Sequence, residues 1–241
     1  MVSSSFDQDR HLATVDGRDA SGWGGRWYGV APAVVSAIND PDGQGRIKVK
    51  LPWSPDAGGE GYEAWARMAT LFAGRDRGSW FLPEVGDEVL VAFEQGDPRR
   101  PYVLGGLWNG QDNPPAALAG GANTLKVIKS RRGVKVTLDD SEGQERLKLE
   151  TPGGQSITLK DGPGKIEISD SNGNTMTFEA AGITITATAK VTINAPQTSV
   201  SAGIVKVDAG MSKFSGVVQS DTVITNSVIS ASYTPGAGNI W

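Results

Sequence analysis

The chain has 241 residues, a formal net charge of −4, no cysteine and a single histidine, His11. These values exclude a disulfide framework and a thiolate metal site, leave almost no residues for histidine catalysis or histidine–metal clusters, and argue against a nucleic-acid partner. No apolar run reaches the roughly 18 residues of a membrane helix, and the polar start of the chain lacks the apolar core of a secretion signal.

Residues 1–26 are expected to form a flexible N-terminal arm, because they are polar and rich in serine and glycine. Trp23 and Trp27 lie at the end of this arm. Aromatic side chains in such a place predict an anchor, either on a partner protein or on the domain that follows. The residues alone do not separate these two interpretations.

Residues 27–109 predict a compact unit of short strands separated by turns. Asn39–Gly43 and Glu94–Pro98 have the Asx, glycine and proline chemistry of turns. About five short strands without a helical pattern are typical of a small barrel such as the OB-fold. The expected strands are Val30–Ile38, Arg46–Leu51, Trp65–Thr70, Glu88–Phe93 and Tyr102–Leu107.

Residues 110–124 are expected to be a linker, because the pair Pro114-Pro115 ends regular strand pairing and stiffens the chain. From Leu125 to about residue 232, apolar residues two positions apart recur at short, near-regular intervals. The pairs are Val134/Val136, Leu147/Leu149, Ile157/Leu159, Ile166/Ile168, Met176/Phe178, Ile183/Ile185, Val191/Ile193 and Val205/Val207. Such repetition predicts a stacked, elongated β architecture over residues 125–232.

The clearest part of the repeat is Ile183–Ala195, where every odd position is apolar and every even position is polar. This alternation predicts one continuous strand with one buried face. Ordering the backbone costs about 1–2 kcal/mol per residue, whereas burying a Val or Ile side chain returns about 1.5–3 kcal/mol. Two such residues per repeat are too few for a lone strand, so the apolar side chains are expected to face copies of themselves.

A closed trimer fits this repeat, although other closed symmetries and an ordinary β-sandwich remain as alternatives. A sandwich core usually needs more bulk than the few aromatic residues after residue 125 supply. The side chains expected at the trimer axis are Ile157, Leu159, Ile166, Ile168, Met176, Phe178, Ile183, Ile185, Val191, Ile193, Val205 and Val207.

Five segments of the barrel unit resemble a known family in their order and spacing. They are Asp40–Val49 (DPDGQGRIKV), Trp65–Ala69 (WARMA), Pro83–Phe93 (PEVGDEVLVAF), Gly96–Gly105 (GDPRRPYVLG) and Leu107–Gly110 (LWNG). Together they resemble the OB domain of contractile-tail spikes, the group of baseplate assembly protein V and VgrG. The resemblance covers residues 27–115 closely, and the alternating C-terminal part agrees with it.

The resemblance implies an all-β homotrimer, in which an OB-fold collar precedes an intertwined trimeric β-helix that forms a needle. It also implies a structural, non-enzymatic role in piercing a target membrane, with assembly in the cytoplasm into a phage tail or a phage-tail-like particle. Because only about 26 residues precede the barrel, the hub is expected to be a separate protein. Residues 233–241 are expected to bind a tip protein of the PAAR type through Asn239, Ile240 and Trp241.

The sequence also contains residues for two other kinds of site. Trp53, Trp65, Trp80 and Trp108 would be stacking platforms if the OB unit bound single-stranded nucleic acid, although packing within or between subunits fits the acidic chain better. Carboxylates for glycoside hydrolysis would come from Asp139, Asp140, Glu142, Glu145 and Glu150, but these cluster at a turn and are expected to be solvated. No cofactor or metal is expected in this chain.

Overall fold

The computed structural model describes residues 26–54, 59–118 and 120–232. These residues contain strands and one short 3-10 turn, η1 (Glu94–Gly96), but no α-helix, so the prediction of an all-β fold is confirmed. No helix in the described part of the chain is long and apolar enough to cross a membrane. The chain divides into two units after Lys190.

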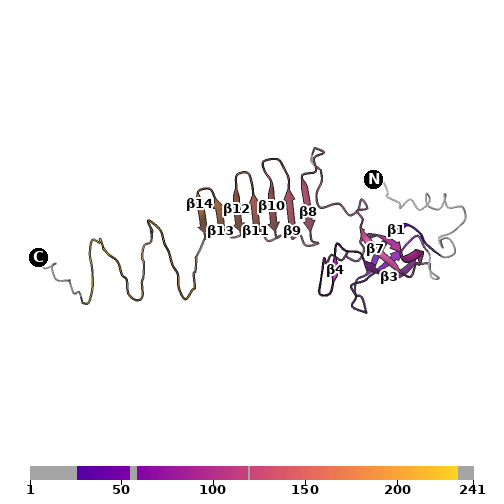
Figure 1. Ribbon diagram of the computed structural model, residues 1–241, viewed down its shortest axis with the longest axis horizontal. Coiled ribbons are helices and arrows are strands. Elements are labelled where there is room, and N and C mark those ends of the chain that lie inside the picture. The colour runs from indigo at the N-terminus through magenta and orange to yellow at the C-terminus, as the bar shows by residue number, and fades with distance from the viewer. Residues whose placement is uncertain (1–25, 55–58, 119, 233–241) are drawn as a thin grey trace. The chain divides into compact units, whose positions relative to one another are not determined.

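The N-terminal domain is a closed barrel with the strand order β1-β2-β3-β7-β6 (Figure 1). Its pairings are antiparallel except for β3 with β7, which is parallel. The strands are β1 (Val30–Ala37), β2 (Ile47–Leu51), β3 (Tyr62–Met68), β6 (Glu88–Phe93) and β7 (Pro101–Gly106). The five expected strands are therefore confirmed, and we call this domain, residues 26–109, the collar.

Alternating inward side chains build the core of the collar. In β2, Ile47, Val49 and Leu51 are fully buried, and the residues between them point outward, as the two-residue period of a strand requires. β3 begins at Tyr62 rather than at Trp65, because Tyr62 and Ala64 still pair with β2. Alanine has a low strand propensity, so the sequence pattern did not reveal this first part of the strand.

The predicted turn at Asn39–Gly43 is held by one carboxylate. Asp40 accepts backbone N–H groups from Asp42, Gln44 and Arg46 at 3.1, 2.8 and 3.1 Å, and the Arg46 guanidinium at 2.6 Å. The hydrogen bond from Arg46 is the main reason why the pKa of Asp40 lies well below its usual range. This network connects the end of β1 to the start of β2.

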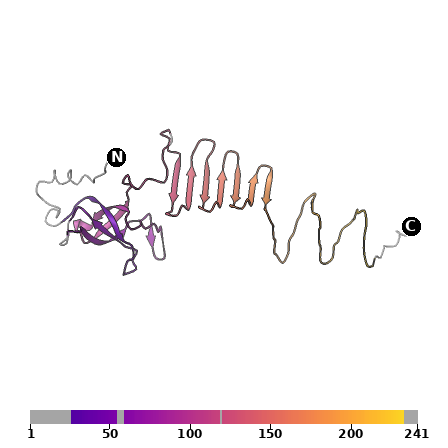
Figure 2. The same cartoon turned by 180° about the vertical axis from the view of Figure 1, so that it is seen from behind.

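Between β3 and β6, the chain forms a two-stranded hairpin that the sequence did not predict. Its strands are β4 (Ala73–Gly74) and β5 (Arg77–Gly78), which pair with each other. Strands of this length leave no alternating pattern, and glycine and arginine are not strand-forming residues. Both views of the chain show the hairpin extending from the barrel (Figures 1 and 2).

After the linker, seven strands form a single antiparallel sheet in chain order, from β8 to β14 (Figure 1). Each strand turns tightly into its neighbour, and glycines with positive φ, such as Gly133 at 90° and Gly173 at 84°, occupy these turns. The strands are β8 (Leu125–Lys129), β9 (Lys135–Asp139), β10 (Arg146–Glu150), β11 (Ser156–Lys160), β12 (Lys165–Ser169), β13 (Thr175–Glu179) and β14 (Gly182–Thr186).

The prediction of one continuous strand over Ile183–Ala195 is wrong for the single chain. β14 ends at Thr186, and the backbone bends at Thr188 and Ala189. An extended segment becomes a strand only when a neighbour accepts and donates its backbone hydrogen bonds. Beyond β14, no strand among the described residues is such a neighbour.

Residues 191–232, which we call the tail, contain no strand. The tail is a series of short extended segments separated by bends, as its zigzag course shows (Figure 2). The bends lie mostly at residues that favour turns, such as Pro196, Gly203, Gly210 and Gly216. The repeat of the sequence thus continues through the tail as a series of bends, without paired strands.

Candidate trimer interface

The register of the sheet sorts its side chains onto two chemically different faces. Residues directly opposite in neighbouring strands share a face, and Leu147 lies opposite both Leu138 and Leu159. The same holds from β9 to β14, and we call the resulting surface the apolar face. In β8 the pattern is broken, because Lys126 lies opposite Leu138 and Val127 lies opposite Thr137. The apolar face consists of Val136, Leu138, Leu147, Leu149, Ile157, Leu159, Ile166, Ile168, Met176, Phe178, Ile183 and Ile185.

None of the residues that the structure describes covers the apolar face. Leu159 and Ile168 keep 41% and 42% of their surface exposed, and Ile185 keeps 60%. A monomeric protein rarely leaves a continuous apolar surface of this kind in water. All the residues of β11 to β14 that were predicted to lie at the axis are on this face, so the structure brings them together on one surface.

The opposite, polar face is largely paired within the chain, although the buried Thr137 hydroxyl has no hydrogen-bond partner among the described residues. Arg146 bonds Asp139 at 2.9 Å, Lys135 bonds Glu150 at 3.5 Å, and the hydroxyls of Ser156 and Ser169 are 2.9 Å apart. On this face Thr137 and Asp139 are buried, with 8% and 7% exposure. The sheet therefore buries polar groups while leaving leucine and isoleucine exposed, the reverse of what a finished soluble surface shows.

The ionisable groups of the polar face are held in their charged forms. A hydrogen bond from Ser141, supported by Arg146, lowers the pKa of Asp139. Lys148 and Lys135 lower the pKa of Glu150, and Glu167 raises the pKa of Lys165. Asp139, Glu150 and Lys165 each have a partner of opposite charge on the same face, so this side can remain in contact with water.

The tail exposes nearly all of its apolar side chains. Ile193 and Val207, both predicted to lie at the axis, are 73% and 67% exposed, and Val191 and Val205 are similar. The structure does not bring these four residues together. The sequence reading also missed other exposed apolar residues in the tail, whose spacing is less regular: Val200, Ile204, Met211, Phe214, Val217, Val218, Val223, Ile224, Val228 and Ile229.

In the collar, Trp27 belongs to an aromatic cluster of the barrel. Its ring lies 4.9 Å from Trp53, 5.1 Å from Phe93 and 6.0 Å from Tyr62. Trp27 thus packs on its own domain, which is one of the two roles considered for it, and its contact with a hub stays a prediction. Trp23 lies outside the described residues, as do the predicted tip-binding residues Asn239, Ile240 and Trp241.

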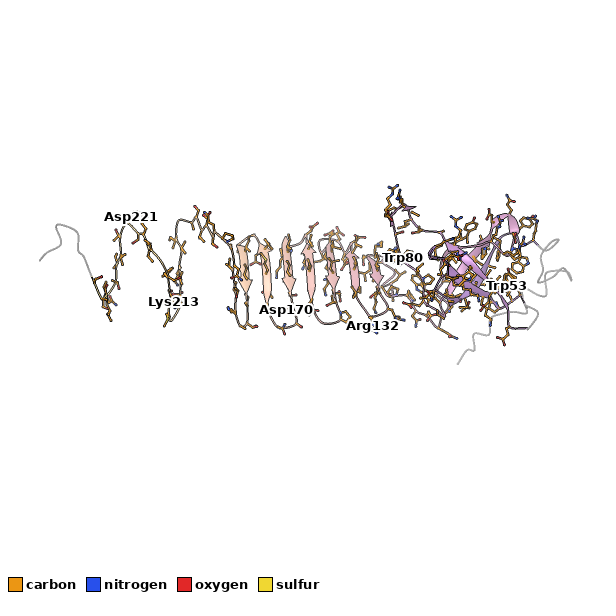
Figure 3. The ribbon with its side chains drawn as sticks, turned by 90° about the horizontal axis from the view of Figure 1, so that it is seen from below. Trp53, Trp80, Arg132, Asp170, Lys213 and Asp221 are labelled. Carbon is orange, nitrogen blue, oxygen red and sulfur yellow. The ribbon has the colours of Figure 1, made fainter. Side chains whose placement is uncertain are left out.

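The four tryptophans considered as stacking platforms differ in environment. Trp53 packs in the cluster just described and donates its indole N–H to the Pro32 carbonyl at 2.9 Å. Trp65 lies beneath the Arg46 guanidinium, 5.7 Å from its ring centre. Trp80 and Trp108 are exposed, at 71% and 69%. Trp53 and Trp80 lie well apart on the collar, so the four do not form one platform (Figure 3).

The acidic residues near the β9–β10 turn form ordinary turn and sheet contacts. Asp139 pairs with Arg146, Asp140 approaches Lys126 at 3.3 Å, and Glu145 accepts the Gly143 N–H at 3.1 Å. Among the described residues, no group of three or more His, Cys, Asp or Glu side chains is placed to hold a metal ion.

Two family models match this chain. Residues 31–108 match the injector OB domain of the type VI secretion system and phage baseplate, and residues 146–206 match the phage baseplate V C-terminal trimerisation domain. The first match coincides with the barrel. The second begins at β10 and runs into the tail, across the apolar face.

Similar curated proteins are spike proteins. The type VI secretion system spike protein VgrG1b of Pseudomonas aeruginosa is 31% identical over 127 residues, which are 49% of this chain and 17% of that protein. VgrG3 of Vibrio cholerae is 32% identical over 128 residues, 48% of this chain and 13% of that protein. The actin cross-linking toxin VgrG1 of Vibrio cholerae is 31% identical over 130 residues, 51% of this chain and 11% of that protein.

This chain therefore spans less than a fifth of the length of each of these relatives. The name of the toxin describes a protein of which most lies outside the match. The closed barrel is the structure expected for the matched OB domain, and the uncovered apolar face is the structure expected for the matched trimerisation domain. The chain belongs to the phage baseplate V family of spike proteins and carries its injector OB domain followed by its trimerisation domain.

Proposed function

We propose that this chain is the central spike of a contractile injection apparatus and acts mechanically, as a homotrimer without enzymatic activity. The observation that carries the proposal is the uncovered apolar face, because much of it lies in the segment that matches the trimerisation domain. Three copies of this face, turned toward a common axis, would form a closed core with the charged face outside.

In this arrangement the tail supplies strands to the other copies. Its segments are extended and apolar, and none of them pairs with a strand in the part of the chain that the structure describes. Winding three tails together would satisfy their backbone groups and bury their Val and Ile side chains, each worth about 1.5–3 kcal/mol. The result is an intertwined trimeric β-helix without free strand edges, which resists local unfolding under load.

The proposed partners lie at the two ends of the chain. A separate hub protein binds at the collar end, with the N-terminal arm and Trp23 as part of the contact. A tip protein of the PAAR type binds residues 233–241 through Asn239, Ile240 and Trp241. Assembly takes place in the cytoplasm, and contraction drives the trimer and its tip into a target membrane. Any metal belongs to the tip protein.

The first experiment measures the mass of the full chain by native mass spectrometry and its electrophoretic mobility after mild SDS treatment. An SDS-resistant trimer is expected, whereas a monomer under both conditions would end the proposal.

The second experiment deletes residues 236–241 and tests co-purification with the tip protein. The trimer should persist and tip binding should be lost. Retained binding would show that the tip is held elsewhere.

A further inference from the structure

The turns at the two edges of the sheet from β8 to β14 differ in charge. In an antiparallel sheet that follows chain order, successive turns lie alternately at one edge and at the other. We call the edge formed by turns 140–145, 161–164 and 180–181 the acidic edge. These turns contain no lysine or arginine, and their charged residues are Asp140, Glu142, Glu145 and Asp161.

The other edge, formed by turns 130–134, 151–155 and 170–174, is called the basic edge. The charged residues of these turns are Arg131, Arg132 and Asp170. Figure 3 shows Arg132 and Asp170 at this one edge of the sheet. Both arginines lie in the β8–β9 turn, so the positive charge is concentrated there.

The β8–β9 turn has more cations than its own chain neutralises. Lys129 and Lys135 lie opposite each other where the strands leave this turn. Arg131 bonds Glu84 of the collar at 3.2 Å. The Arg132 guanidinium has no hydrogen bond or ion pair with any described residue. This turn therefore presents a positive charge that is free to pair with a carboxylate from outside the chain.

The acidic edge lacks countercharges in the same way. Lys126 bonds Asp140 at 3.3 Å, but the carboxylates of Glu142 and Asp161 have no hydrogen bond or ion pair in the part of the chain that the structure describes. Like charges that stay close together are unfavourable unless cations approach them. The acidic edge is thus complementary to the basic edge in sign.

The acidic turns are packed against each other and form an ordered surface. The Asp161 N–H donates to the Glu145 carbonyl at 3.0 Å. A Cβ atom added at Gly162 would clash with the Gly143 carbonyl oxygen, so only glycine allows the two turns to approach so closely. The negative charge of the β9–β10 and β11–β12 turns is therefore held in one place.

We propose that the basic edge of each copy packs against the acidic edge of the next copy in the trimer, with Arg132 of one chain paired with Glu142 of its neighbour. This inference rests on the proposed trimer. When three sheets turn their apolar faces to a common axis, rotation brings unlike edges together at each of the three contacts. Complementary charge there selects this arrangement over packings that bring like edges together.

The levels of the two turns fit this pairing. Rotation about the axis leaves all copies at the same height, so heights within one chain apply to its neighbours as well. The β8–β9 and β9–β10 turns follow one another along the sheet and differ by one strand spacing, about 5 Å. A long arginine side chain at Arg132 spans this difference and reaches Glu142 of the next copy.

The first experiment uses the absence of cysteine from the chain. In the variant Arg132→Cys/Glu142→Cys, the two thiols of one chain lie at opposite ends of β9, about 16 Å apart at 3.3 Å per residue. A disulfide requires Cα atoms within about 7 Å, so any disulfide between these positions joins two copies. The matched control is Arg132→Cys/Asn172→Cys, whose two exposed positions both lie on the basic edge.

After oxidation with copper phenanthroline, we expect covalent dimers and trimers of Arg132→Cys/Glu142→Cys on denaturing gels without reductant, and only monomers of the control. An intact trimer in native mass spectrometry without disulfides between these positions would overturn the inference and leave the proposed spike untouched. Cross-links in the control would show that like edges meet, which also refutes it. If wild-type chains do not trimerise at all, the proposed function fails as well.

The second experiment reverses the charges and does not depend on introduced thiols. Arg132→Glu and Glu142→Arg are prepared singly and together, and the dissociation rate of each trimer is measured in urea at low salt. Each single variant should dissociate at least about threefold faster, because three exposed pairs, each weak alone, are lost together. The double variant restores opposite charges and should return to within about twofold of the wild-type rate.

Salt provides the internal control for the charge reversals. The differences among the variants should shrink in 1 M sodium chloride, which screens exposed charges. A double variant that dissociates as fast as the faster single variant, or differences that do not depend on salt, would contradict the pairing of the two edges.

Discussion

The sheet and the tail have the same kind of sequence and different structures. Both alternate apolar and polar residues, but β8 to β14 pair within one chain, whereas residues 191–232 contain no strand. The turns account for part of the difference. The Asp170 carboxylate accepts the N–H groups of Asn172 and Asn174, both at 2.9 Å, and this closes the β12–β13 turn. The tail has bends instead of such closed turns.

A chain that reverses tightly brings its next strand alongside the previous one and satisfies its backbone by itself. A chain that only bends does not bring its next segment alongside the previous one. Its backbone groups then need hydrogen-bond partners, and its apolar side chains need cover, from other copies of the chain. We infer that the sheet forms its strands within a single copy, whereas the tail forms paired strands only in the assembled trimer. The following predictions test this difference.

The largest effect is expected from Ile185→Asp, which places a carboxylate on the apolar face. Burying an unpaired charge is too costly for the trimer to form. Thr186→Asp is the control, because Thr186 pairs with Thr175 on the polar face and its replacement should be mild. Light scattering after gel filtration distinguishes monomer from trimer. Equal damage from both substitutions would mean that the two faces have been misassigned.

Removal of the tail should weaken the trimer without unfolding the sheet. A chain that ends at Lys190 keeps β8 to β14 and should retain their circular dichroism signal. It loses the interchain burial of residues such as Ile193 and Ile224, so we expect it to dissociate on dilution and to lose resistance to SDS. Deletion of residues 236–241 alone should leave the trimer intact. A tail-less trimer as robust as the full one would contradict the proposed intertwining.

Within the sheet, Leu159→Ala should destabilise the trimer by about 2–5 kcal/mol per copy, because a buried leucine leaves a cavity when it is truncated. Leu159 lies opposite Leu147 and Ile166 on the apolar face. The neighbouring Thr158→Ala, on the polar face, should change stability by about 0.5 kcal/mol or less. Guanidinium unfolding of the two variants measures the difference. Similar losses at both sites would be inconsistent with one buried face.

The smallest effect is expected in the collar, where Asp40→Asn should lower the melting temperature of that domain and leave trimerisation unchanged. The folded pKa of Asp40 is lowered, and an unfolded aspartate titrates near 3.9. The stabilisation by Asp40 is therefore present above about pH 4 and shrinks as the pH falls below that value. Asp76→Asn, at a side chain that is 95% exposed, is the control. Calorimetry from pH 3 to 7 should show a difference between wild type and Asp40→Asn that narrows at low pH.

Much of this architecture could be predicted from residue patterns. β6 was predicted with its observed bounds, because Val89, Val91 and Phe93 alternate cleanly between a Gly-Asp turn and a second turn. The pairs Ile157/Leu159 and Ile166/Ile168 were predicted to share a surface, and the two-residue period of strands explains why they do. The hairpin of β4 and β5 was missed because strands of two residues carry no period.

The end of β14 at Thr186 could not be predicted either, because the alternation of Ile183–Ala195 continues unchanged through the bend. Alternation records which side of a strand is apolar, and it contains no information about which chain supplies the neighbouring strand. The same limit applies to Trp80, whose exposure depends on the position of the hairpin of β4 and β5 and not on its own neighbours in sequence.

The sequence by itself thus determined the chemistry: an all-β chain, an OB barrel, a repeat with one apolar side and a family resemblance that the comparisons confirm. Only the tertiary structure decided which apolar side chains are buried and which polar groups find partners within the chain. It closed the barrel around its own core and paired charges across the polar face of the sheet. Among the described residues, nothing covers the apolar face or the apolar side chains of the tail. The reason is physical, since local patterns set the direction of side chains, while burial depends on which surfaces meet.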